Sequence, residues 1–307
     1  MAQLIKLENY ISRYERDIFH YPGHYIRLKQ ENWKKLHHLW LEHQEMKIEE
    51  IEEDTSSSIQ PSRWKSLFFK QSKAREEIDD YTDTDIYPVR PTTIDELKRY
   101  FLDSLLPFQL KWASSTVDKI SFLDKGYETD ELLKFFLQRL PDTFLVMFRP
   151  IFKLKKTVVE ADIIIIHPVG IEIIKIFNLE PSKSIIVQDG RTWFTEENNI
   201  QTKMLNPMIS AGRTEKIIKS ILSFEELDFP IKKVMLSFEN SIHFHAEPYN
   251  TVLIDKNNIE TWIRKKQQFV SPLKRDQLKV SEALLRHCDT VAVPRPEWNQ
   301  EKESEWE

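Results

Sequence analysis

Residues 160–177 read EADIIIIHPVGIEIIKIF, two runs of isoleucine separated by Pro168-Val169-Gly170. Short apolar, β-branched runs bounded by turn residues are typical of buried strands. This stretch therefore predicts a hairpin in which residues 158–167 form one strand and residues 171–177 return as the next. A strand that is apolar on both faces must lie inside a sheet with both faces covered, so helices are expected on either side.

The segments around this hairpin agree with such a layered fold. Further strands are predicted at residues 145–152, 184–187, 192–194, 233–238 and 251–254, with the segments 184–194 extending the same sheet, and helices at 213–222 and 259–268. Before them, residues 28–51 form an amphipathic helix candidate, and Thr93-Ile-Asp-Glu96 is a capping box that opens another helix. Thr129 can cap the helix that follows it. The predicted fold class is α/β, a mixed sheet flanked by helices and preceded by a mainly helical region over residues 1–125.

Composition narrows the class of protein further. The chain has 307 residues, of which 40% are hydrophobic and 30% charged, enough for a packed core. Its one cysteine, Cys288, excludes an intramolecular disulfide and a zinc site built from cysteines. The most apolar stretch, residues 161–177, is interrupted by charged and turn residues, and the N-terminus lacks the pattern of a secretory signal. We therefore expect a cytoplasmic protein without membrane contact.

Four segments, in order, resemble the nuclease-related domain (NERD) family. They are Asp130-Glu-Leu-Leu133 ending at Pro141, Glu160-Ala-Asp162 entering the isoleucine strand, the turn at Gly170, and Gly190…Trp193…Asn206-Pro207. The likeness covers residues 126–270, followed by a C-terminal helix and acidic tail at 271–307. It implies a restriction-endonuclease-like core and, in active members, hydrolysis of phosphodiesters with a divalent metal held by hard oxygen ligands.

The resemblance also implies where the chemistry should lie. In the family, the strand after the glycine carries Glu-x-Lys, and here those positions hold Lys175 and Phe177. The acidic positions remain as Asp130 and Asp162. With an ammonium replacing a metal ligand, we predict a degenerate site without a cofactor, in which Lys175 forms an ion pair with Asp162.

One alternative is an active Mg²⁺-dependent nuclease of DNA or RNA, with Asp130, Asp162 and Glu172 as metal ligands and Lys175 as the catalytic lysine. Glu172 and Lys175 are three residues apart, a spacing that puts them on opposite faces of a regular strand. This alternative therefore requires a bulge between them.

Partners are expected at local basic clusters, because the formal net charge of −5 gives no overall attraction to nucleic acid. The candidate phosphate contacts are Arg149, Lys153, Lys155, Lys156, Arg264, Lys265 and Lys266. The same residues also fit an ordinary solvated surface, which leaves open a scaffold that binds proteins through its N-terminal helices. His243 and His245 have a spacing that zinc could use, but their polar surroundings favour a solvated loop.

Overall fold

The computed structural model describes residues 1–52, 91–154 and 157–295. Their Cα positions fall into two compact units, one of Met1–Gly23 with Leu105–Glu307 and one of His24–Ser104. The predicted linker around residues 54–61 and the acidic tail at 297–307 lie outside the described residues.

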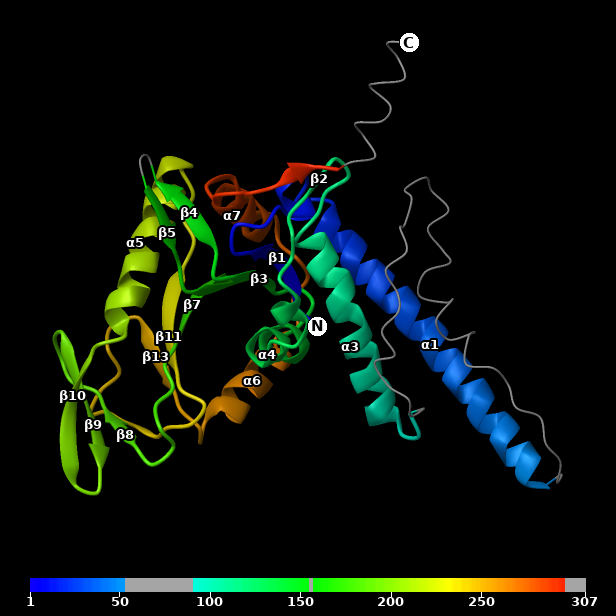
Figure 1. Cartoon of the computed structure of the whole chain (residues 1–307), viewed down its shortest axis with the longest axis horizontal. Helices are drawn as coiled ribbons and strands as arrows, with labels where there is room; N and C mark the ends of the chain where they lie inside the picture. The colour runs from blue at the N-terminus through cyan, green and yellow to red at the C-terminus, as the bar shows by residue number, and fades with distance from the viewer. Residues whose placement is uncertain (53–90, 155–156, 296–307) are drawn as a thin grey trace, which may run out of the picture. The chain divides into compact units, whose positions relative to one another are not determined.

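The first unit is built on a six-stranded mixed sheet (Figure 1). Its order is β1 (Gln3–Leu7), β3 (Leu145–Phe148), β6 (Ile163–His167), β7 (Gly170–Ile176), β11 (Ile231–Leu236) and β13 (Thr251–Ile254). Strand β6 runs antiparallel to both neighbours. The other three pairs of neighbours, β1 with β3, β7 with β11 and β11 with β13, are parallel. The predicted α/β class is confirmed.

The hairpin of β6 and β7 forms the centre of this sheet, as predicted. His167 pairs with Gly170, and the isoleucines of both strands up to Ile174 are buried. A side chain at position 170 would bring its Cβ to 3.1 Å from the carbonyl oxygen of Pro230. Glycine is therefore favoured at this position, because the backbone of Pro230 approaches it closely.

Two predicted strands, at 145–152 and 158–167, are each broken in the middle. Arg149 has a left-handed backbone (φ 48°) and precedes Pro150, which has no N–H to continue the pairing. The chain beyond the break leaves the main sheet, and β4 (Ile151–Leu154) and β5 (Thr157–Glu160) form a separate two-stranded sheet, with one further bridge from Phe152 to Cys288. The apolar pattern does not distinguish one long strand from two short ones in different sheets.

A second sheet has four strands and was not predicted as a separate layer. Its order is β10 (Ile200–Leu205), β9 (Thr192–Glu197), β8 (Ser184–Ile186) and β12 (Ile242–His243). The expectation that the segments 184–194 extend the main sheet is wrong. A short pair, β2 (Lys119–Ile120) with β14 (Val293–Pro294), completes the strands of the described residues.

Helices cover the main sheet. They are α4 (Glu131–Arg139), α5 (Met208–Phe224), α6 (Ile259–Gln267) and α7 (Arg275–Arg286), with the 3-10 turns η1 (Arg13–Glu15) and η2 (Lys125–Glu128). Helix α5 packs on β7 and β11, α7 packs on β6 and α5, and α4 packs on β3. None of the helices in the described ranges is long and apolar enough to cross a membrane.

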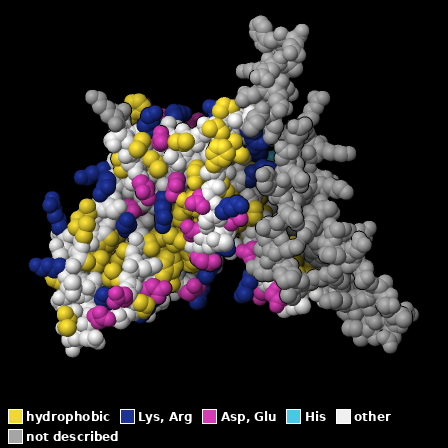
Figure 2. Space-filling model, viewed as in Figure 1, with side chains coloured by type: hydrophobic (Ala, Val, Ile, Leu, Met, Phe, Trp, Pro, Cys, Tyr) yellow, Lys and Arg dark blue, Asp and Glu magenta, His cyan; other side chains and the backbone are white. Residues whose placement is uncertain are grey.

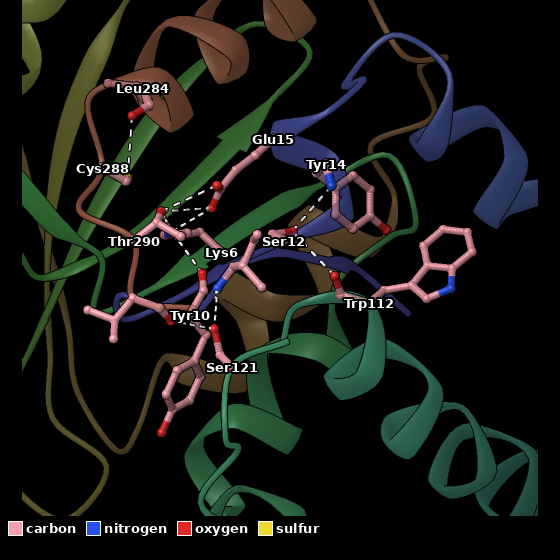
Figure 3. A network of polar contacts seen from close by, with 12 residues as sticks. Lys6, Tyr10, Ser12, Tyr14, Glu15, Trp112, Ser121, Leu284, Cys288 and Thr290 are labelled. Atoms are coloured by element: carbon pink, nitrogen blue, oxygen red, sulfur yellow. Dashed lines mark hydrogen bonds and ion pairs between the residues drawn. The ribbon is translucent and has the colours of Figure 1, made fainter. Parts of the chain in front are cut away.

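The helical character predicted for residues 1–125 does not include Gln3–Leu7, which form the edge strand β1. Lys6 is fully buried there, and its ammonium donates to the Tyr10 carbonyl and Thr290 Oγ1, both at 2.8 Å, and pairs with Glu15 at 2.5 Å (Figure 3). A buried lysine needs such partners. They join the N-terminal strand to residue 290, near the other end of the chain.

The second unit contains most of α1 (Tyr21–Glu52) and the first part of α3 (Ile94–Trp112). Helix α1 begins seven residues before the predicted start. The capping box is confirmed, because Thr93 Oγ1 accepts from the Glu96 N–H at 3.2 Å and Glu96 accepts from the Thr93 N–H at 3.3 Å. Trp33 packs against Phe101 across the two helices.

Candidate functional site

Asp162 and Lys175 meet where β6 begins and β7 approaches its end. The antiparallel register pairs Ile163 with Ile174, so Asp162 lies opposite Lys175 on the same face of the sheet. Lys175 Nζ is 3.0 Å from Asp162 Oδ1, and only 8% of the Asp162 side chain is exposed. The predicted ion pair is present.

Helix α5 supplies two hydroxyls to the same carboxylate. Ser210 Oγ lies 3.1 Å from each Asp162 oxygen, and Thr214 Oγ1 lies 3.1 Å from Oδ2. Thr214 also accepts from the Asp162 N–H at 3.2 Å. Together with the ammonium, these hydroxyls provide three donors, so the protein itself solvates the charge of Asp162.

Phe177 lies two residues after Lys175, at the position where the resemblance implied a lysine. Its ring meets Trp193 edge to face at a centroid distance of 5.8 Å, and Trp193 is fully buried. The pair joins the end of β7 to β9 of the second sheet. The position therefore contributes apolar packing between two sheets.

Asp130 caps helix α4. Its carboxylate accepts from the Leu133 N–H at 2.8 Å, the usual contact of a residue that precedes a first helical turn. The prediction that Thr129 caps this helix is wrong, since Thr129 ends the preceding turn η2. Asp130 therefore stabilises the start of α4 as its N-cap, a role that the family resemblance did not indicate.

Glu172 lies on the opposite face of β7 from Lys175. It forms an ion pair with Lys266 of α6, and its Oε1 is 4.0 Å from His167 Nε2. The pairing of β7 with β6 and β11 continues without a register shift through the region that joins Glu172 to Lys175. The described strand β7 therefore lacks the bulge that the active-nuclease alternative requires.

His167 lies beside this ion pair and stacks on Phe144 at 5.4 Å. Burial lowers the pKa of His167 to about 4, helped by the positive charges of Lys266 and Lys232. The imidazole is neutral at pH 7 as a result.

The residues at this site do not fit a divalent cation. Magnesium needs several oxygen ligands, and Asp162 is the single carboxylate among the described residues of this network, with an ammonium directly on it. Across residues 1–52, 91–154 and 157–295, no group of three His, Cys, Asp or Glu side chains is arranged to hold a metal. His243 and His245 are exposed, as expected, but the predicted loop is wrong for His243, which ends strand β12.

The predicted phosphate contacts divide into three groups. Four of them are exposed: Arg149, Lys153, Arg264 and Lys265. Lys266 is not available to a phosphate, because it is 15% exposed and paired with Glu172. Lys155 and Lys156 lie outside the described residues. Figure 2 shows lysine and arginine side chains dispersed over the described part of one face, with acidic side chains between them.

The Asn-Pro motif has a structural role that the sequence did not indicate. Asn206 Nδ2 donates to the Gly190 carbonyl at 2.7 Å, and its Oδ1 accepts from the Met208 N–H at 2.9 Å. The side chain thus ties the turn before β9 to the first turn of α5. Gly190 has a φ of +93°, which explains the glycine.

A pocket of about 390 Å³ lies away from this site, between the segment Tyr14–Phe19 and the end of α7. Cys288 lines it, and burial raises the pKa of its thiol to about 12. Its Sγ donates to the Leu284 carbonyl (Figure 3). A thiol that stays protonated at neutral pH is a poor nucleophile, which agrees with a packing role.

Comparison with known proteins identifies the central segment. Residues 125–238 match the family model described as nuclease-related domain, in agreement with the resemblance that the motifs indicated. A protein of Geobacillus stearothermophilus named RNA 2',3'-cyclic phosphodiesterase is 35% identical over 122 residues. That similarity spans 36% of this chain and 36% of the relative, so the chain spans about a third of that protein's length. No solved structure matches.

Proposed function

We propose that the nuclease-related segment binds nucleic acid and has lost metal-dependent phosphodiester hydrolysis. One observation carries the proposal: the Asp162 carboxylate is occupied by Lys175, Ser210 and Thr214. A metal would have to displace an ammonium 3.0 Å away and would find no second carboxylate among the described residues of the network.

The other acidic candidates support the same conclusion. Asp130 accepts a helix N–H, and Glu172 is paired with Lys266 of α6 on the face of β7 opposite to Lys175. Neither can join Asp162 around one ion without a change in the backbone or a break in these interactions. Phe177 cannot supply the ammonium that polarises an attacking water.

The nucleic-acid part of the proposal rests on the surface cations outside this network. Arg149 lies at the bend between β3 and β4 and Lys153 lies within β4, whereas Arg264 and Lys265 share the last turn of α6. Such side chains neutralise phosphates without reading sequence. The nuclease-related domain gives the fold in which this binding is expected.

The catalytic half is tested by incubating the protein with plasmid DNA, single-stranded DNA and RNA in Mg²⁺ or Mn²⁺. An oligoribonucleotide ending in a 2',3'-cyclic phosphate is included because of the name of the relative. We expect no turnover of any substrate. Hydrolysis that disappears in Asp162→Ala would overturn the proposal.

A rebuilt site provides the positive control. Lys175→Glu with Phe177→Lys restores Glu-x-Lys on one strand face, beside Asp162. We expect Mn²⁺ binding, measured by electron paramagnetic resonance, in this variant and not in the natural protein. Adding Asp162→Ala to the rebuilt variant should remove it. Equal Mn²⁺ binding by the natural protein would contradict the proposal.

The binding half is tested by fluorescence anisotropy with labelled single-stranded RNA and duplex DNA at several salt concentrations. The double variant Arg149→Gln with Lys153→Gln should bind more weakly. Its affinity should also depend less on salt: the slope of log affinity against log salt concentration should become shallower by roughly one unit for each phosphate no longer neutralised. Lys98→Gln, at an exposed lysine of α3, is the matched control and should have no effect. Absence of binding at low salt would favour the protein-binding scaffold instead.

A further inference from the structure

Strand β10 is an open edge of the second sheet. It pairs with β9 on one side, and no element of the described chain lies beyond it on the other (Figure 1). All of its residues except Met204 are exposed, including Ile200 at 69% and Leu205 at 72%. Large apolar side chains at an open strand edge invite pairing with another strand.

The register shows which backbone groups face outward. Ile200 pairs with Glu197 and Thr202 with Thr195, and the Asn206 N–H continues this series by donating to the Arg191 carbonyl at 3.0 Å. Residues with even numbers therefore direct their N–H and C=O groups toward β9. In an antiparallel pair the direction alternates along the strand, so Gln201, Lys203 and Leu205 direct theirs away from the sheet.

The edge lacks most of the features that usually block pairing. Strand β10 contains no proline, and its pairing with β9 has no bulge. Lys203 is its single charged residue. A regular six-residue edge of this kind is long enough to add another strand.

We propose that β10 pairs antiparallel with β10 of a second copy of this chain, with the two-fold axis at Thr202. The two four-stranded sheets then form one continuous sheet across the dimer. In this register Thr202 faces Thr202, Gln201 faces Lys203 twice, and Ile200 faces Met204 twice.

This occupant is favoured because the strand is complementary to itself in that register. The outward-facing groups of Gln201 and Lys203 meet in hydrogen-bonded pairs on both sides of the axis. The exposed Ile200 side chain is removed from water, because it packs against Met204 of the second copy. Centring the axis on Lys203 would instead place two lysines directly opposite each other, which is destabilising.

The test is sedimentation velocity of the full chain over a range from about 1 to about 100 µM, since dimerisation depends on concentration. We expect the mass to approach twice the 36.8 kDa of the monomer. Thr202→Lys and Thr202→Glu should each be monomeric, because like charges meet on the axis. Thr202→Val should dimerise as the natural protein does.

Mixing the two charged variants identifies the register. The introduced lysine of one copy would face the introduced glutamate of the other only if position 202 lies on the axis. An equimolar mixture should therefore restore a dimer whose stability falls with added salt. Thr202 is exposed, and circular dichroism checks that each variant remains folded. A natural protein that stays monomeric, a dimer that survives Thr202→Lys, or a mixture that stays monomeric would overturn the proposal.

Discussion

Asp162 and Lys175 form an ion pair that is partly shielded from water. The carboxylate is 8% exposed and the ammonium 30% exposed, so removing only the lysine leaves a poorly solvated negative charge. Removing both charges leaves an amide that can still accept from Ser210 and Thr214. The two changes should therefore differ in their effect on stability.

We expect Lys175→Met to lower the free energy of unfolding by about 2 kcal/mol, between the values of exposed and buried pairs. The double variant Asp162→Asn with Lys175→Met should lose less than this single variant. Urea denaturation of the four members of the cycle measures the coupling. If the single and double variants lose the same free energy of unfolding, the Asp162 carboxylate is not stabilised by Lys175.

His167 makes stability depend on pH. Its pKa is about 4 in the folded protein and 6.5 ordinarily, so the unfolded chain binds a proton more readily in this interval. The contribution of the neutral His167 side chain to the free energy of unfolding is complete above about pH 6.5 and is lost as the pH falls through 4.

Relative to His167→Phe, which keeps an aromatic ring against Phe144, the natural protein should lose up to about 3 kcal/mol between pH 7 and pH 4. Urea denaturation at several pH values measures this difference. Parallel curves for the two proteins would mean that His167 does not titrate with unfolding.

At the start of helix α4, two neighbouring residues are candidates for the N-cap. Asp130 accepts from the Leu133 N–H, whereas Thr129 belongs to the preceding turn. Both residue types are good caps, and only the geometry of the turn decides between them.

Asp130→Ala should therefore lower the free energy of unfolding by about 1 kcal/mol. Asp130→Asn should keep most of the stabilisation that the cap provides, because an amide oxygen can accept the same hydrogen bond. Thr129→Ala is the matched control and should change stability by no more than roughly 0.5 kcal/mol. A larger loss at Thr129 than at Asp130, measured by thermal or urea unfolding, would reverse the assignment.

At the scale of the whole molecule, the segment that matches the nuclease-related domain does not contain the whole main sheet. Residues 125–238 hold β3, β6, β7 and β11, but β1 and β13 at the two edges of the main sheet come from outside it. Helix α7, which packs on α5 and β6, also lies outside. Lys6 further ties β1 to Thr290.

We expect a fragment of residues 125–238 to lack a cooperative unfolding transition, because the faces that β1, β13 and α7 cover would be exposed to water. Far-UV circular dichroism during urea denaturation tests this, with the full chain as control. A fragment that unfolds as cooperatively as the full chain would show that the outer elements are dispensable.

Several features could be predicted from local sequence alone. The hairpin of β6 and β7 follows from two apolar runs around a turn, and the capping box at Thr93 follows from residues three apart. The pair of Asp162 with Lys175 was expected from the family resemblance, which places both residues at one site on the hairpin. In each case, the deciding contacts join residues close together along the chain.

Tertiary structure alone decided the rest. Gln3–Leu7 become a strand because β3 is there to pair with them, and the segment after Arg149 pairs with β5 outside the main sheet. No local pattern specifies the partners or turns on which three other features depend. These are the separate second sheet, the capping of α4 by Asp130, and the pairing of Glu172 with Lys266. Local patterns record which residues prefer strand, helix or burial, whereas the partner of each residue is set by packing between segments far apart in the chain.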